Sequence, residues 1–154
     1  MEAAVQGHWR NGLTARLAYT LTAENLPRNK AGERMSAQYI PARKHSLMVH
    51  ADWEHRFHKN FGMTLGIDGR YLSGVTNPEY IDYYDVSKGM RDIEYPGYTL
   101  WKFSAAGQFK KGVKITLALD NLFNYRPKYY YLNSPLTDGL NVMLGVSIDI
   151  DKLF

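Results

Sequence analysis

The sequence predicts an all-β fold: an antiparallel, up-and-down meander of about seven long strands that forms part of a transmembrane β-barrel. Three observations support this prediction. Apolar and polar residues alternate with period two along several segments. These segments are about nine to eleven residues long, which is the length of a tilted membrane strand. Between them, short turns and long polar loops alternate along the chain, as they do in outer-membrane barrels.

The first three expected strands cover residues 3–10, 13–22 and 46–57. The first alternates weakly, with alanine, valine, glycine and tryptophan opposite mostly polar side chains. The second places leucine, alanine and tyrosine opposite mainly threonine and arginine. The third opposes an apolar row, which runs from Leu47 to Phe57, with serine, histidine, arginine and acidic groups. Because successive side chains of a strand point to opposite faces, each segment has one apolar and one polar face.

The next three expected strands cover residues 61–71, 101–109 and 113–120. Each opposes an apolar row with polar residues such as threonine, serine, lysine, arginine or aspartate. The apolar rows also tend to begin or end in an aromatic residue, as strands do where they cross a membrane interface. These aromatic residues are Trp9, Phe57, Phe61, Tyr71, Trp101 and Phe109.

The seventh expected strand lies in the stretch 140–154 and shows the clearest pattern. Its even-numbered residues from Leu140 to Ile150 are all apolar, whereas the odd-numbered ones are polar or small apart from Met143. A long strand that is apolar on one side only is what the closing strand of an outer-membrane barrel needs, because lipid must meet an unbroken apolar row.

The connections between the expected strands fall into two groups. Short turns are expected at residues 10–12, 58–60 and 110–112, and long polar loops at 24–42, 74–98 and 124–139. In a meander this order puts all tight turns at one end and all long loops at the other, as in outer-membrane barrels. A soluble antiparallel sheet packed on a second layer remains an alternative, because such sheets also alternate.

The composition narrows the classes of protein further. No window approaches the roughly 18 consecutive apolar residues of a transmembrane helix, and the chain contains no cysteine for disulfides or thiolate metal sites. The net charge is +4 and the basic residues are scattered, so we expect no nucleic-acid partner. The N-terminal residues lack the basic and apolar regions of a signal peptide, which suggests an internal start or a missing upstream part.

Residues 117–130, LALDNLFNYRPKYY, carry a resemblance to a known family. Asp120, Asn121, Leu122, Phe123 and Asn124, followed by Lys128-Tyr129-Tyr130, resemble the penultimate-strand motif of TonB-dependent outer-membrane receptors. Residues 40–47 resemble the proline-histidine sequence with which a strand begins in that family. Tyr95-Pro96-Gly97-Tyr98 resembles the sequence at the start of a later strand. Residues 145–150 are similar to the C-terminal signal that the barrel-assembly machinery reads.

This resemblance implies a role and a set of partners. Residues 1–154 would be the C-terminal portion of a receptor barrel of about 22 strands, without its plug domain and earlier strands. Its function would be TonB-energised uptake of a scarce nutrient, such as siderophore-bound iron, haem, cobalamin or a glycan, across the outer membrane of a Gram-negative bacterium. The implied partners are outer-membrane lipid, the rest of the receptor, the TonB complex through the missing plug, and the barrel-assembly machinery.

Three groups of residues are candidates for function. Charged residues of the polar face are expected to line a barrel lumen: Arg16, His50, Asp52, Glu54, Asp68 and Arg70. Loop tyrosines are expected to face a ligand, because tyrosine gives broad amphipathic contact: Tyr80, Tyr83, Tyr84, Tyr129, Tyr130 and Tyr131. Asp120 and Asn121 are expected to end a strand and to organise the next loop through Asx-type hydrogen bonds.

We expect no enzymatic activity, cofactor or resident metal. Haem ligation by His8, His45, His50, His55 or His58 is conceivable, but His58 falls in a short turn and His55 in an apolar row. An outer-membrane hydrolase would need Ser46 and His50 to meet in a triad, and spacing alone does not show such geometry. A soluble β-sheet binding or adhesion module is the alternative function.

Overall fold

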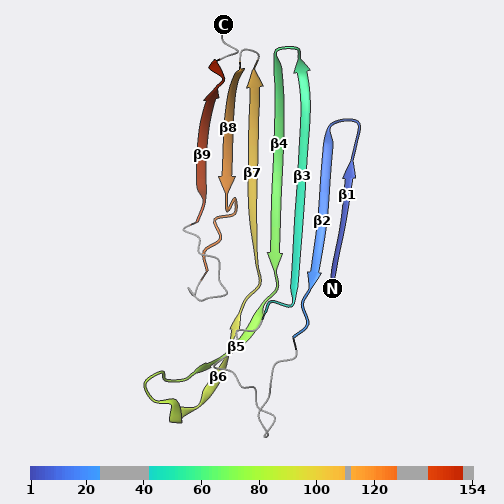
Figure 1. Ribbon diagram of the computed structural model, residues 1–154. Coiled ribbons are helices and arrows are strands. Elements are labelled where there is room, and N and C mark those ends of the chain that lie inside the picture. The colour runs from blue at the N-terminus through green and yellow to red at the C-terminus, as the bar shows by residue number, and fades with distance from the viewer. Residues whose placement is uncertain (25–41, 110–111, 128–138, 151–154) are drawn as a thin grey trace.

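The computed structural model describes residues 1–24, 42–109, 112–127 and 139–150 (Figure 1). Its strands are β1 (Glu2–His8), β2 (Leu13–Leu21), β3 (His45–His58), β4 (Phe61–Leu72), β5 (Val75–Tyr80), β6 (Met90–Tyr95), β7 (Tyr98–Phe109), β8 (Val113–Asp120) and β9 (Asn141–Ile148). A short 3-10 turn, η2 (Val86–Lys88), lies between β5 and β6. In the described part of the chain, no helix is long and apolar enough to cross a membrane.

Seven strands form one antiparallel sheet in the order β1-β2-β3-β4-β7-β8-β9, which confirms the predicted meander. The described tight turns lie at one end, at the top of Figure 1, and the long connections lie at the other. The strand lengths are less even than predicted. The central strands β3, β4 and β7 have 14, 12 and 12 residues, whereas β1 has 7 and β8 and β9 have 8 each.

The register of the sheet separates apolar from polar residues. One cross-strand row contains Val5, Leu17, Val49, Gly69 and Trp101, and the adjacent row contains Gln6, Arg16, His50, Asp68 and Lys102. Because side chains alternate between faces, these two rows point to opposite sides of the sheet. A slip of one residue would move every apolar side chain to the wrong face, so the hydrophobic pattern fixes this register.

The predicted polar loop at residues 74–98 contains two strands that the sequence did not indicate. Here β5 pairs with β6 as a separate two-stranded hairpin that leads away from the long-loop end of the sheet (Figure 1). The polar composition of these strands and Pro78 within β5 conceal them in the sequence, since proline disfavours a strand. The hairpin passes close to the sheet at Gly97, where a Cβ atom would lie 2.9 Å from the carbonyl oxygen of Leu72.

The apolar face of the sheet has no covering layer among the described residues. Among the described residues, the only buried hydrophobic side chains are Tyr95 of the hairpin and Tyr98 at the start of β7, whereas Leu17 on the apolar face is 43% exposed and Leu144 74% exposed. A soluble sandwich would bury such a face against a second sheet. This observation disfavours the soluble alternative and fits a barrel wall, in which lipid covers the apolar side.

Candidate functional site

A hydrogen-bonded cluster lies near the middle of the polar face. His50 on β3 places Nδ1 2.7 Å from Asp68 Oδ1 on β4 and Nε2 2.6 Å from Asp52 Oδ2 on its own strand. An ionised carboxylate only accepts hydrogen bonds. The imidazole ring of His50 therefore bridges the two carboxylates.

Neighbouring strands extend this cluster into a row of charges. In the register, Arg16 of β2 stands opposite His50, and Lys102 of β7 stands opposite Asp68. Gly66 leaves room beside the cluster, because a Cβ atom there would lie 2.7 Å from Asp52 Oδ1 and 2.6 Å from Ser104 Oγ. The side chains of His50 and Asp52 are about 40% exposed, so each ion pair contributes less than about 1 kcal/mol.

The six residues predicted to line a lumen share this face. Glu54 stands opposite Thr64, and Arg70 stands between Met48 and Leu100; Arg16, His50, Asp52 and Asp68 belong to the cluster and its row. Among the described residues, no group of three or more His, Cys, Asp or Glu side chains is arranged to hold a metal ion. The arrangement makes a hydrophilic wall.

The serine–histidine triad considered for a hydrolase does not form. Ser46 lies four residues from His50 along β3, a separation of about 13 Å at the rise of a strand. The hydrogen bonds of the His50 ring go to Asp52 and Asp68. This geometry offers no nucleophile next to its base.

The other histidines occupy separate places in the sheet. His8 Nδ1 lies 3.0 Å from Thr14 Oγ1, and His45 Nδ1 lies 2.7 Å from the hydroxyl of Tyr19. His55 stacks on Trp53 with ring centroids 5.2 Å apart, on the apolar face as predicted. The rings of His8, His45 and His55 therefore do not converge on a common site that could hold haem.

The family motif at residues 120–124 organises the backbone that follows β8. β8 ends at Asp120, and Asn121, only 3% exposed, adopts a positive φ of 52°. Its Nδ2 donates to the carbonyl of Tyr125 at 2.8 Å, and its Oδ1 accepts from the amide of Tyr125 at 2.8 Å. The predicted side-chain hydrogen bonding is thus present, although it reaches the fourth residue onward rather than the second. Asn124 Oδ1 also accepts from the amide of Leu140 at 3.0 Å.

The structure also shows a cluster at the long-loop end that sequence reasoning missed. Arg43 donates from Nη1 to the carbonyls of Ser73 and Pro96 at 2.5 and 3.1 Å, and its guanidinium lies 4.8 Å from the ring centre of Tyr98. Tyr98 in turn stacks on Tyr125 at 5.3 Å. We call these residues, together with Asn121, the loop-end cluster: Arg43, Ser73, Pro96, Tyr98, Asn121 and Tyr125. It connects β3, β4, β7 and the segment after β8. Most of its members, namely Arg43, Pro96, Tyr98 and Asn121, fall in the stretches that carry the family resemblance, but the sequence did not indicate that these stretches meet.

The described loop tyrosines lie on the β5–β6 hairpin. Tyr84 is fully exposed and Tyr83 is 64% exposed, while Tyr80 packs edge-on against Tyr83 with centroids 6.2 Å apart. Asp82 holds the tip: its Oδ1 accepts from the amide of Tyr84 at 2.9 Å and its Oδ2 from Lys88 Nζ at 2.7 Å. The Lys88 hydrogen bond, helped by the Tyr84 amide, lowers the pKa of Asp82 below its ordinary value. Tyr129, Tyr130 and Tyr131 lie outside the described residues.

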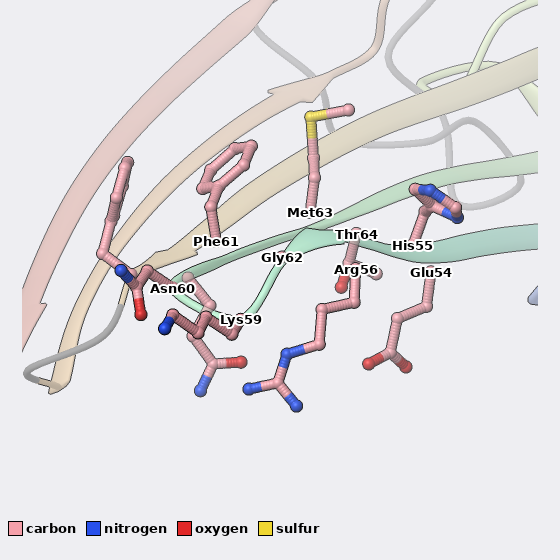
Figure 2. A pocket seen from close by; sticks show the side chains of 11 residues that line it. Glu54, His55, Arg56, Lys59, Asn60, Phe61, Gly62, Met63 and Thr64 are labelled. Carbon is pink, nitrogen blue, oxygen red and sulfur yellow. The ribbon is translucent and has the colours of Figure 1, made fainter.

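A hollow of about 360 Å³ adjoins the turn between β3 and β4. Figure 2 shows that Phe61 and Met63 project to one side of the strands there and that Glu54 and Arg56 project to the other. The lining therefore belongs to both faces of the sheet, and it does not enclose a ligand.

The one-sided sheet, its polar face and the separation of tight turns from long loops define the class of an outer-membrane β-barrel wall. Residues 1–122 match the family model described as TonB dependent receptor-like, beta-barrel, and the chain belongs to that family. The family is one of outer-membrane receptors and transporters of Gram-negative bacteria rather than enzymes. No curated protein and no solved structure matches the sequence significantly.

Proposed function

We propose that residues 1–154 are the C-terminal barrel segment of a receptor for TonB-energised uptake of a scarce nutrient. The observation that carries the proposal is an uncovered apolar face on a sheet whose other face is charged, in a chain of the TonB-dependent receptor family. Siderophore-bound iron, haem, cobalamin and glycans are the candidate nutrients. The plug domain would connect the receptor to the TonB complex.

Strand direction supports a segment that needs further strands. The seven sheet strands alternate in direction, so the two edge strands β1 and β9 run the same way. Suppose that several copies of this sheet, all in the same membrane orientation, formed a barrel by pairing β9 of one copy with β1 of the next. Each of these junctions would then pair two parallel strands. An entirely antiparallel barrel, as in bacterial outer-membrane proteins, requires an odd number of additional strands. We therefore propose that the rest of the receptor supplies them and that the barrel-assembly machinery joins the edges.

In this proposal the long loops capture the ligand and the polar face lines its route. The exposed rings of Tyr83 and Tyr84 offer contact area on a hairpin whose tip is fixed by Asp82 and Lys88. The charges around His50 keep the wall hydrated. No step of chemistry is required of these residues, because uptake is driven through the plug.

The test measures uptake in cells that express the intact receptor. A panel of ferric siderophore, haem, cyanocobalamin and maltooligosaccharide is supplied to wild-type, receptor-deleted and TonB-deficient strains. We expect one nutrient to lose uptake in both mutant strains. Uptake of every nutrient at wild-type rates in the receptor-deleted strain would contradict the proposal.

A double variant tests the role of the hairpin. Tyr83→Ala with Tyr84→Ala should weaken binding of that nutrient, since each exposed aromatic ring contributes on the order of 1 kcal/mol. Tyr71→Ala, on the apolar face of β4, is the matched control. Unchanged affinity in the double variant would exclude ligand capture by these rings.

Residues 1–154 expressed alone should not transport in this proposal, because their seven-stranded sheet would have to join further strands to close a barrel. Cells that express only residues 1–154 should show no TonB-dependent uptake of any of the four nutrients. Fractionation separates the alternative: a detergent-free monodisperse monomer would indicate a soluble binding or adhesion module, whereas membrane association and heat-modifiable mobility would support the barrel.

A further inference from the structure

We propose that the short-turn end of the apolar face binds the headgroups of anionic glycerophospholipids. The inference rests on the proposed function in one respect, namely that the sheet lies in a bilayer. It adds a lipid preference and assigns it to particular residues.

Aromatic rings form a continuous cluster at this end of the apolar face. His55 stacks on Trp53 at 5.2 Å, Phe57 packs edge-on against His55 at 4.7 Å, and the chain of contacts continues to Phe61 at 5.7 Å and Phe109 at 5.1 Å. We call these five residues the short-turn belt. Amphipathic and aromatic rings gather where a membrane protein meets the headgroup layer.

The position of the belt agrees with the thickness of a bilayer. His45, bonded to the Tyr19 hydroxyl, and His55, in the belt, stand ten residues apart on β3. That distance is about 33 Å along a strand. At the usual strand tilt it becomes about 25 Å along the membrane normal, the height of the apolar band in such barrels.

The two tight turns next to the belt each carry a basic residue. The β1–β2 turn, which carries the exposed Arg10, packs on it: Trp53 Nε1 donates to the carbonyl of Asn11 at 3.2 Å. On the other side, an irregularity in the pairing between Arg56 and His58 sets His58 opposite Phe61. The exposed Lys59 follows directly in the turn.

The described strands place no acidic group on the same face. In the described strands, the alternation and register place every Asp and Glu of the sheet on the polar side, and Figure 2 shows Glu54 projecting away from Phe61 and Met63. The short-turn end therefore combines two turns that carry cations with an apolar face on which the described strands place no carboxylate. A phosphodiester that carries net negative charge fits this surface better than a zwitterionic headgroup, whose amine would meet Arg10 and Lys59.

The occupant is a glycerophospholipid rather than a lipopolysaccharide because of the end at which the belt lies. Tight turns face the periplasm in outer-membrane barrels, and the leaflet on that side consists of glycerophospholipids. Acyl chains would cover the apolar rows next to the belt, where Met63, Leu65 and Val146 continue the face.

The experiment uses the receptor purified from outer membranes and reconstituted into vesicles of phosphatidylethanolamine with one fifth phosphatidylglycerol. Native mass spectrometry of the released protein then gives the ratio of the two lipids that it retains. We expect enrichment of phosphatidylglycerol. Arg10→Gln with Lys59→Gln should lower that enrichment by about fivefold for each charge removed. Lys44→Gln with Lys88→Gln, which removes the same charge at the long-loop end, should leave it unchanged.

Three outcomes would overturn the inference: equal retention of both lipids by the wild type, unchanged enrichment in the Arg10/Lys59 variant, or the same loss in the control variant. If the Arg10/Lys59 variant does not fold, the wild type decides the matter, because raising the salt concentration from 50 to 500 mM must lower the enrichment. A receptor that enters neither pure phosphatidylethanolamine nor mixed vesicles would contradict the proposed function instead.

Discussion

A single arginine placed on either face of β2 tests whether lipid contacts the apolar side. Leu17 lies at the middle of this strand, between Val5 and Val49 in the apolar row. Ala18, the next residue, lies on the polar side between Ala4 and Met48. Leu17→Arg and Ala18→Arg therefore add the same side chain at the same depth, but toward opposite environments.

The two environments predict different magnitudes. Leu17 is 43% exposed in the sheet, so in water its replacement would behave as a surface change and alter stability by about 0.5 kcal/mol or less. Arginine on the lipid face at the bilayer midplane costs about 2–4 kcal/mol. That range corresponds to a change of about 30- to 900-fold in the folding equilibrium. Ala18→Arg should stay near the surface value, because its side chain meets the hydrated face.

The assay is equilibrium unfolding of the receptor in phospholipid vesicles, followed by urea and by heat-modifiable mobility on gels. We expect Leu17→Arg to lower the free energy of unfolding by at least about 2 kcal/mol more than Ala18→Arg. A difference below about 0.5 kcal/mol would refute the assignment of the apolar face to lipid. A larger loss for Ala18→Arg would show that the two faces are exchanged.

Three further changes test other parts of the structure. Asn121→Ala removes both hydrogen bonds to Tyr125 at a positive φ, so we expect a loss of about 1–3 kcal/mol and faster proteolysis after residue 121. Gly66→Ala, whose Cβ would meet Asp52 and Ser104, should lower the folded fraction, whereas Gly62→Ala on the same strand, with its nearest neighbour at 3.7 Å, should not. The lowered pKa of Asp82 means that its contribution to the hairpin is present above the ordinary value of 3.8 and is lost as the pH falls through the lower folded value. Lys88→Met should therefore move the loss of hydrogen-exchange protection at the Tyr84 amide upward in pH, and an unshifted profile would contradict this cause.

The sequence was sufficient to predict the sheet because one rule governs it. Each strand must present apolar groups to one side, so period-two alternation located all seven strands and their faces. The β5–β6 hairpin does not follow this alternation. It stands outside the apolar band, its strands need no lipid-facing row, and Asn77 and Pro78 within β5 resemble loop residues. Alternation is therefore informative only where the membrane imposes it.

For the candidate site, the sequence predicted which face each residue occupies but not which residues are in contact. Alternation placed His50, Asp52 and Asp68 on one face, but only the register between β3 and β4 brings His50 and Asp68 within hydrogen-bond distance. The contacts of Arg43 join residues from positions 43 to 98 through backbone carbonyls. Carbonyl acceptors exist at every residue, so no sequence pattern identifies which of them an arginine will reach.

The buried residues of the described chain concentrate at one end of the sheet. Apart from two glycines in β4, the buried described residues lie at or beyond the long-loop end, including Ser73, Tyr95, Tyr98 and Asn121. A barrel wall in lipid needs no core of its own, because lipid and backbone pairing hold its strands. Loops that leave the membrane lose that support, and a precise binding surface requires rigid side chains beneath it. In the proposed function, the loop-end cluster would supply that support next to the β5–β6 hairpin, at the end of the sheet where the buried residues concentrate.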